Sequence, residues 1–426
     1  MVENFFKDPE LVTRELKSYW LQEDQQKIFD GFSENTITNY VLPYCVAPNM
    51  LINDRFYCVP MVTEESSVVA AAAASAKYWA ERGGIKTSVI STKKVGQVHF
   101  KWFGASEKLF SVFAQLKMQL LADTADLTKS MEQRGGGICE IQLLDFNKEE
   151  PNYYQLFVKF ETCDSMGANF INSVLEQFGI SLGNFLKNEA SLTGIEKDVD
   201  VIMCILSNYT PECLVKAQIS CKIDDLADNS IGMDAGAFAE RFYLAVRMAN
   251  IDSYRATTHN KGIFNGIDAV VIATGNDFRA VEAGGHAFAA KDGMYKSLSN
   301  CSLENDEFKF WIEMPMAIGT VGGLTKLHPI AKRSLELLEH PSAKELMQII
   351  VATGLMQNFS AVRSLVTTGI QKGHMKMHLM NILNHLGAND TETEQSLQYF
   401  KDKSVSFTAV REFLAEVRDI SKENKH

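Results

Sequence analysis

The sequence lacks the features that mark disordered, membrane-spanning and nucleic-acid-binding chains. Only 9 of 426 residues are proline, no basic run of five or six residues occurs, and the longest apolar run near the start covers only 68–74. A membrane-spanning helix needs roughly 20 such residues. A formal net charge of −11 disfavours nucleic acid and anionic membrane surfaces as partners. The N-terminus has no signal-peptide pattern. We therefore expect a soluble cytoplasmic protein.

Metal-binding and disulfide motifs are also missing. The 8 cysteines form no C-x-x-C pair, and most lie in apolar stretches, which is typical of buried thiols in a reducing compartment. His374 and His378 have the spacing of one helical face, but no carboxylate accompanies them. We expect no metal site.

The common nucleotide and hydrolase motifs are absent as well. The sequence contains no G-x-G-x-x-G, no P-loop, no H-E-x-x-H and no G-x-S-x-G. A doubly wound dinucleotide-binding fold is therefore not supported.

The order of the predicted elements points to a different fold. Between about 92 and 207 we expect a β-α-β-β-α-β order, which is the ferredoxin-like arrangement. Its elements are strand 94–103, a helix from Ser106 to about Met131, strands 138–146 and 152–162, helix 167–178 and strand 198–206. The predicted fold class is α+β. A large, mainly helical domain (1–91 and 208–370) is interrupted by this small domain (92–207), and a C-terminal helical segment (371–426) follows.

Local patterns add several expectations. Asn53-Asp54 predicts the turn of a hairpin within 50–60. Thr63 and Ser66 are helix-capping types ahead of the run Ala70–Ala74, which predicts close packing against another backbone or a partner chain. A strand is expected at 308–316, and helices are expected at about 329–340, 342–357 and 359–370.

Polar residues stand where a purely structural chain does not need them. Glu65 heads an apolar helix, Lys261 and Asn265 are four residues apart, and Asp277 and His374 each follow small residues. Each has a structural explanation: a helix cap, a solvated lysine or a surface histidine. Together they supply a carboxylate, a cation, an orienting acid and an imidazole, the groups of an acid–base site.

Six segments, in order, carry a family resemblance. The chain resembles the class II (bacterial-type) 3-hydroxy-3-methylglutaryl-CoA (HMG-CoA) reductases over nearly its whole length. The segments are Val59–Ala70, Asp164–Asn169, Thr258–Asp268, Ala273–Asp277, Gly354–Phe359 and Gly373–Met375. Two positions depart from the family pattern: Ser66 replaces the usual proline and Ser165 the usual alanine.

The resemblance implies reductive deacylation of HMG-CoA to mevalonate and CoA, or the reverse, with two nicotinamide hydrides. Mevaldyl-CoA hemithioacetal and mevaldehyde are the implied intermediates. It also implies a nucleotide on the small domain, a homodimer with shared active sites, and a C-terminal flap over the site. The resemblance leaves undecided whether several dimers assemble further.

The resemblance assigns four catalytic roles. Glu65 is the proton donor at the aldehyde stage, Lys261 stabilises the thioester oxyanion, and Asp277 links both in a hydrogen-bonded network. His374 protonates the departing CoA thiolate.

The resemblance also assigns binding residues. Those for the acyl group are Ser67, Arg255, Asn208, Asn265 and Gln357. A guanidinium binds a carboxylate in a bidentate manner, which suits Arg255. Asn208 and Gln357 also fit simple capping roles.

The implied nucleotide residues are Asp164, Met166, Gly167 and Asn169, at a helix start whose amides can hold a phosphate. A tight helix start without a ligand explains the same loop. The resemblance places Glu140 at the position that discriminates between nucleotides in the family. An acid there favours NADH over NADPH, because it accepts from a ribose hydroxyl and repels a 2′-phosphate. An exposed strand acid is the alternative, and Arg134 lies nearby.

Two other functions stay open. One is a reductase of another carboxylated acyl-CoA. The other is a catalytically silent protein that binds CoA or a nucleotide.

Overall fold

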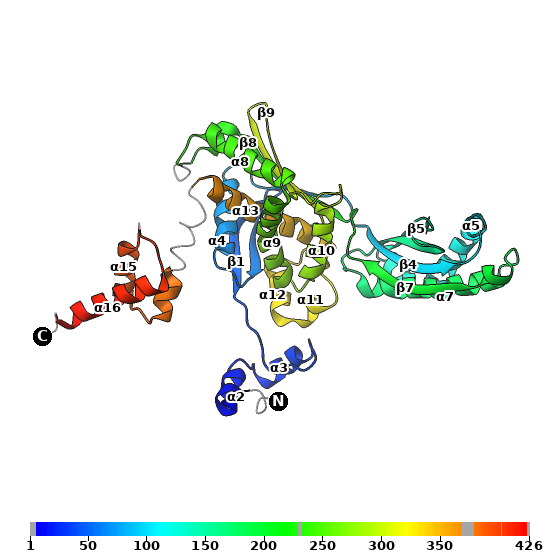
Figure 1. Ribbon diagram of the computed structural model, residues 1–426, viewed down its shortest axis with the longest axis horizontal. Coiled ribbons are helices and arrows are strands. Elements are labelled where there is room, and N and C mark those ends of the chain that lie inside the picture. The colour runs from blue at the N-terminus through cyan, green and yellow to red at the C-terminus, as the bar shows by residue number, and fades with distance from the viewer. Residues whose placement is uncertain (1–5, 229–231, 368–378, 402, 424–426) are drawn as a thin grey trace.

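The computed structural model describes residues 6–228, 232–367, 379–401 and 403–423. A central body carries a smaller α/β unit on one side and the C-terminal helices on the other (Figure 1). Helices α2 (Pro9–Lys17) and α3 (Glu23–Asp30) extend from the body at the N-terminus. Buried apolar side chains form three separate clusters, within 47–85 and 213–362, within 98–192, and within 379–414. The predicted mixed α+β class is confirmed, whereas the domain boundaries stay a prediction.

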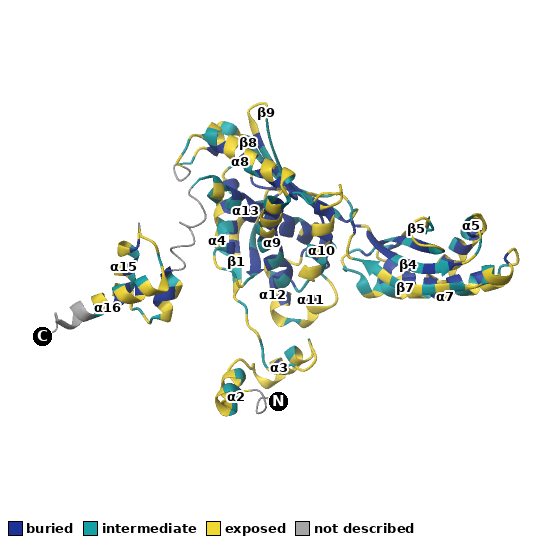
Figure 2. Ribbon diagram, viewed as in Figure 1, coloured by how far each residue is buried: buried dark blue, intermediate teal, exposed yellow. Residues whose placement is uncertain are grey.

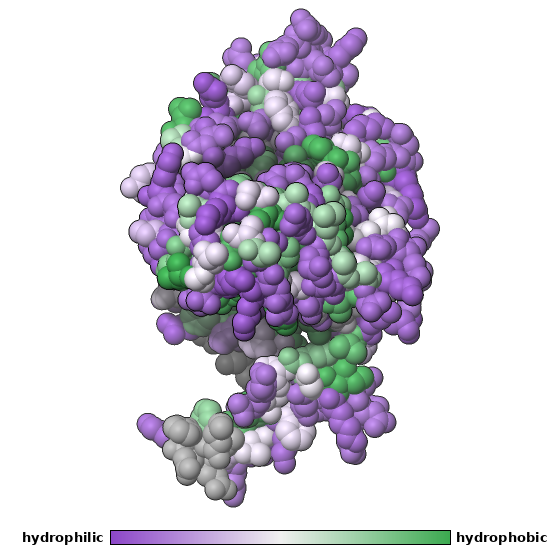
Figure 3. Space-filling view, turned by 90° about the vertical axis from the view of Figure 1, so that its right-hand side faces the viewer, coloured by the Kyte–Doolittle hydropathy of each residue, from purple (hydrophilic) through white to green (hydrophobic). Residues whose placement is uncertain are grey.

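The smaller unit contains a four-stranded antiparallel sheet in the order β5-β6-β4-β7. Its strands are β4 (Lys94–Trp102), β5 (Gly137–Asp145), β6 (Tyr153–Glu161) and β7 (Val199–Ser207). Helices α5 (Ser106–Asp123) and α7 (Ala168–Asn188) pack on one face through residues such as Leu116 and Phe178. The end of the molecule that this unit forms is mainly hydrophilic, with smaller hydrophobic areas (Figure 3).

One helix of this unit differs from the prediction. The expected helix from 106 to about 131 is divided at Thr124 into α5 and α6 (Ala125–Glu132). The Thr124 hydroxyl donates to the Leu120 carbonyl at 2.8 Å, a side-chain bond that competes with the helical pattern. A short 3₁₀ turn, η1 (Gly194–Lys197), precedes β7.

The central body contains a sheet that the sequence analysis largely missed. Strands β3 (Lys86–Val89), β8 (Leu214–Lys222), β10 (Glu307–Pro315) and β9 (Ser299–Glu304) lie in this order and are antiparallel. Only β10 was expected. The predicted hairpin is present as β1 (Tyr44–Ile52) and β2 (Arg55–Val62). Its turn residues Asn53 and Asp54 have φ of 47° and 67°, a conformation that asparagine and aspartate tolerate.

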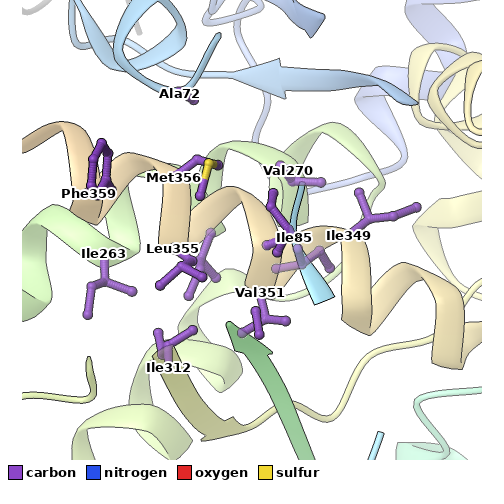
Figure 4. Close-up of a cluster of buried hydrophobic side chains, with 14 of the residues drawn as sticks. Ala72, Ile85, Ile263, Val270, Ile312, Ile349, Val351, Leu355, Met356 and Phe359 are labelled. Carbon is purple, nitrogen blue, oxygen red and sulfur yellow. The ribbon is translucent and has the colours of Figure 1, made fainter. Parts of the chain in front are cut away.

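Helix α13 (Ala343–Val366) is the centre of this body. Leu355, Met356 and Phe359 lie in the same cluster as Ile263 and Val270 of α9 (Ser253–Ala273) (Figure 4). By length and composition α13 could cross a membrane, but it is mostly buried in the protein (Figure 2). The prediction of two helices over 342–370 was wrong: one continuous helix starts at a capping box of Ser342 and Glu345.

Further helices complete the body. Helix α4 (Val68–Ala80) buries Ala72 and Ala76 but exposes Ala70 and Ala74. The remaining elements are η2 (Ile223–Leu226), α8 (Ala235–Ile251), α10 (Phe278–Ala289), α11 (Leu324–Leu327) and α12 (Pro329–Leu337). The described C-terminal part includes α15 (Asp390–Tyr399) and α16 (Phe407–Glu423), which are helical as expected.

Candidate active site

A cavity of about 1240 Å³ lies between the smaller unit and the central body. Four segments line most of it: the end of β2 with the residues before α4, the start of α7, the α9–α10 junction, and the glycine-rich loop before α11. The residues on these segments are 62–65, 165–170, a set from Asn265 to Arg279, and 319 with 321–326. Segments far apart in sequence therefore share one hollow.

The predicted carboxylate and lysine meet here: Glu65 lines the cavity, and Lys261, which is not itself part of the lining, contacts Glu65. The Nζ of Lys261 donates to Oε2 of Glu65 at 2.5 Å, and Nδ2 of Asn265 donates to the same oxygen at 3.3 Å. Lys261 and Asn265 lie one helical turn apart on α9, so both reach Glu65 from one face. The side chains of Lys261 and Glu65 are 60% and 39% exposed, so the pair is open to an incoming molecule. A pair this exposed contributes little to stability.

Ser67 is the N-cap of α4, rather than the expected Thr63 or Ser66. Its φ is 75°, in the left-handed region that a non-glycine residue enters at an energetic cost, and its side chain makes no capping bond. This conformation turns the backbone between Glu65 and the first residue of α4. Sequence offered no signal for it, because serine seldom adopts positive φ.

Asp277 lines the same cavity, but its hydrogen bonds differ from the prediction. Its carboxylate caps α10, accepting from the amides of Arg279 and Ala280 and from the Arg279 guanidinium at 3.2 and 3.3 Å. Burial opposes its ionisation, but the bonds from Arg279 and Ala280 outweigh it and keep the pKa of Asp277 below its usual range. The described contacts contain no bond from Asp277 to Lys261 or Glu65. Free amides at the start of α10 compete for this carboxylate.

The predicted nucleotide loop forms another wall of the cavity. Met166, Gly167 and Asn169 line it, and Gly167, at φ 90°, is the N-cap of α7. Asp164 is placed differently: its Oδ1 accepts from the Ala343 amide at 2.7 Å, and it does not line the cavity. The carboxylate of Asp164 therefore joins the loop to α13.

Glu140 also lies away from the cavity lining. On β5 it pairs with Lys159 at 3.1 Å and accepts a hydrogen bond from Gln142. The bonds from Gln142 and Lys159 hold the pKa of Glu140 below its usual range. A carboxylate with these partners fits the alternative of an exposed strand acid, and whether it selects the nucleotide stays a prediction.

Four predicted acyl-binding residues lie outside the cavity lining: Ser67, Arg255, Asn208 and Gln357. The Nη2 of Arg255 lies 3.5 Å from Nδ1 of His259. Gln357 is buried on α13, and its Oε1 has no hydrogen-bond partner among the described residues. Asn208 follows β7, with its backbone against Gly284. His374 lies outside the described residues.

Asp268 is a cavity residue that the sequence analysis did not single out. It lies three residues after Asn265 and seven after Lys261, on the same face of α9. Burial, with the nearby carboxyl groups of Glu282 and Glu64, raises the pKa of Asp268 to about 8. Its helical spacing from Lys261 was the available signal.

No group of three or more potential metal ligands occurs in the part of the chain that the structure describes. Fold and cavity together define the class: an α+β enzyme with a lysine–carboxylate pair at a large cavity.

Comparison with known proteins gives the family. The family model described as hydroxymethylglutaryl-coenzyme A reductase matches residues 5–379. The chain is 33% identical to the 3-hydroxy-3-methylglutaryl-coenzyme A reductase of Archaeoglobus fulgidus, over 96% of this chain and 90% of that protein. It is 32% identical to a probable enzyme of the same name from Borreliella burgdorferi, over 93% and 89%. The chain therefore belongs to the hydroxymethylglutaryl-coenzyme A reductase family of oxidoreductases.

A solved structure agrees with this assignment. The class II 3-hydroxy-3-methylglutaryl-CoA reductase from Streptococcus pneumoniae, bound to NADPH in open conformations, has a TM-score of 0.74 and 35% identity. The match covers 97% of this chain and 100% of that one. The resemblance inferred from the six segments is confirmed.

Proposed function

We propose that this chain reduces HMG-CoA to mevalonate and CoA, or catalyses the reverse reaction, at the cavity between the smaller unit and the central body. The observation that carries the proposal is the Lys261–Glu65 pair, joined by Asn265, beside the start of α7. A cation next to a carbonyl oxygen stabilises the charge that develops there, and a neighbouring carboxyl group can exchange a proton with it.

The cavity suits a nicotinamide dinucleotide. Its volume of about 1240 Å³ exceeds that of ordinary small-molecule pockets, and its lining includes the cations Arg134, Arg279 and Lys326. Free amides at the start of α7, after Gly167, can hold a phosphate. When bound, the dinucleotide supplies hydride to the carbonyl carbon. We propose NADH over NADPH, on the carboxylate of Glu140 alone, although the Streptococcus pneumoniae relative was solved with NADPH.

The chain's own residues divide the remaining work. Lys261 binds the thioester carbonyl oxygen, and Glu65 returns a proton to the oxygen of the aldehyde. Asp277, at the start of α10, stabilises the region around Lys261 and Glu65. By family resemblance, His374 in the C-terminal segment 371–426 protonates the CoA sulfur, and that segment closes over the site. Arg255 binds the free carboxylate of the acyl group, with Ser67, Asn208 and Gln357 as further contacts.

We further propose a soluble, cytoplasmic homodimer. Lys261 is well exposed, and Arg255 and Gln357 do not line the cavity of this chain, as expected if a second copy completes the acyl site. The exposed Ala70 and Ala74 of α4 offer a surface without bulky side chains for that copy. Light scattering coupled to gel filtration should give twice the chain mass or a multiple of it. A monomer that is fully active would overturn the shared-site proposal.

The decisive experiment follows nicotinamide absorbance with purified protein and HMG-CoA, in parallel with NADH and NADPH. Oxidation of two cofactor molecules per CoA released establishes the reaction. A faster oxidation of NADH than of NADPH supports the role proposed for Glu140. Rates with other carboxylated acyl-CoAs separate HMG-CoA from related substrates. A protein that binds CoA but oxidises neither cofactor would be the silent binder.

The Lys261→Ala variant tests the assigned oxyanion partner. Loss of one such donor costs about 10²–10³ in kcat, while the melting temperature should stay close to that of the parent because the pair is exposed. Lys86→Ala is the matched control, because it removes a 2.6 Å ion pair with Asp54 at a distance from the cavity. Parental activity in Lys261→Ala would refute the role of Lys261.

A further inference from the structure

Lys94, the first residue of β4, has an almost completely buried side chain. It is only 4% exposed, and its Nζ donates to Oγ1 of Thr162 at 2.5 Å and to the carbonyl oxygen of Ser165 at 2.9 Å. Among the ion pairs of the described residues, none includes Lys94. Lysine is almost never fully buried without a charged partner, so this placement needs an explanation.

The electrostatic surroundings leave part of this charge uncompensated. Burial lowers the pKa of Lys94, while the carboxylates of Glu161 and Asp164 act on it only from longer range. Its direct partners are neutral oxygens. Neutral oxygens solvate an ammonium but do not cancel its field. A positive potential therefore persists beside the loop that leads into α7.

The three bonded groups fix the shape of this loop. Besides accepting from Lys94, the Thr162 hydroxyl donates to the Ser165 carbonyl oxygen at 2.7 Å. That carbonyl oxygen is thus held toward Lys94. The loop is also tied to the central body, because the Asp164 carbonyl oxygen accepts from the Thr320 amide at 2.8 Å. Ser165, Met166 and Gly167 come directly after these bonds and line the cavity.

The orientation of the Ser165 peptide matters for an anion at the start of α7. A carbonyl oxygen facing the cavity would repel a phosphate, whereas amide groups facing it attract one. Holding the Ser165 oxygen on Lys94 removes this repulsion. The methyl group of Thr162 also fills the space next to Gly167: a Cβ on Gly167 would lie 2.5 Å from it.

We propose that Lys94, acting with Thr162, is a positioning residue for the cofactor: it holds the 162–167 loop in the conformation that receives a phosphate group of the dinucleotide. This proposal rests on the proposed function, because it assumes that the cofactor binds at the start of α7. Lys94 itself does not line the cavity, so it acts through the Ser165 carbonyl and the Thr162 hydroxyl.

The test compares four variants by direct titration with NADPH and NADH, without HMG-CoA. Thr162→Val removes the hydroxyl and keeps a methyl group next to Gly167, whereas Thr162→Ser keeps the hydroxyl. Lys94→Met removes the charge with a side chain of similar length. Lys101→Met is the control, because it removes a lysine of the same strand that pairs with Glu150 at 2.7 Å, far from the loop.

We expect Thr162→Val and Lys94→Met to weaken cofactor binding by about tenfold or more, the scale of one hydrogen bond to a charged group. Thr162→Ser and Lys101→Met should bind like the parent. In steady-state assays the KM for the cofactor should rise, while the KM for HMG-CoA stays within about twofold of the parental value. Circular dichroism identifies any variant that fails to fold, and the Thr162 pair then decides the test without Lys94→Met.

Parental binding by folded Thr162→Val would overturn the proposal, as would equal rises in both KM values. A parent that binds the cofactor but does not oxidise it with HMG-CoA refutes the proposed function, while the binding comparison still tests Lys94. A parent that binds neither dinucleotide refutes this proposal together with the cofactor assignment.

Discussion

The contact between α9 and α13 predicts a specific cost for Gly266→Ala. Gly266 faces α13, and a Cβ built on it would lie 2.8 Å from the Cβ of Gln357 and 2.9 Å from the carbonyl oxygen of Thr353. The second of these atoms belongs to the backbone of a buried helix, which cannot move aside without disturbing the core around Leu355. The added methyl group must therefore push the two helices apart.

Two effects of opposite sign set the magnitude. Alanine in place of glycine gains about 1 kcal/mol of helix propensity, whereas overpacking a tight core costs about 1–3 kcal/mol. Gly262→Ala is the matched control on the same helix, since its nearest neighbour would be the Cβ of Ala361 at 3.9 Å, an ordinary contact. Gly262→Ala therefore gains helix propensity without the cost of overpacking. The two variants should thus differ by about 1–3 kcal/mol, with Gly266→Ala the less stable.

Urea unfolding followed by circular dichroism measures this difference from the two midpoints. Activity gives a second readout, because separating the helices moves Lys261 and Asn265 relative to Gln357 and should lower kcat. Equal midpoints, or a more stable Gly266→Ala, would refute the close packing of α9 on α13.

Two further predictions concern charge and backbone strain. The pKa of Asp268 is about 8 in the folded protein, whereas that of an unfolded aspartate is about 4. Between these pH values the folded state binds more protons than the unfolded state. The parent protein therefore loses stability as the pH rises through this range. Asp268→Asn should therefore melt higher than the parent by a margin that grows from pH 5 to pH 8 (roughly the upper part of this window), and a constant margin would contradict the elevated pKa. Ser67→Gly relieves the φ of 75° and should stabilise the protein by up to about 1 kcal/mol, while the affinity for HMG-CoA falls; a variant that melts below the parent would show that the conformation of Ser67 is not strained.

Much of this protein could be predicted from short stretches of sequence. Asn53-Asp54 predicted its hairpin because these side chains tolerate the turn conformation that they adopt. The periodicity between about 92 and 207 predicted the order of strands and helices, since each pattern depends on neighbours a few residues away. The family, and with it Glu65 and Lys261, followed from residue identity at fixed spacing, and the structure brings these two side chains together.

Other features depend on contacts that no local pattern encodes. The sheet pairs β3 with β8 and β8 with β10, which are far apart in the chain, so the short edge strand β3 could not be recognised by itself. The amides at the start of α10 determined the hydrogen bonds of Asp277. Burial of Lys94 against Thr162 and Ser165 determined its proposed role as a positioning residue. Sequence determined which chemical groups are available. Tertiary structure decided which of them are desolvated and which oxygen or amide each one meets, because hydrogen bonding and burial depend on distance in space.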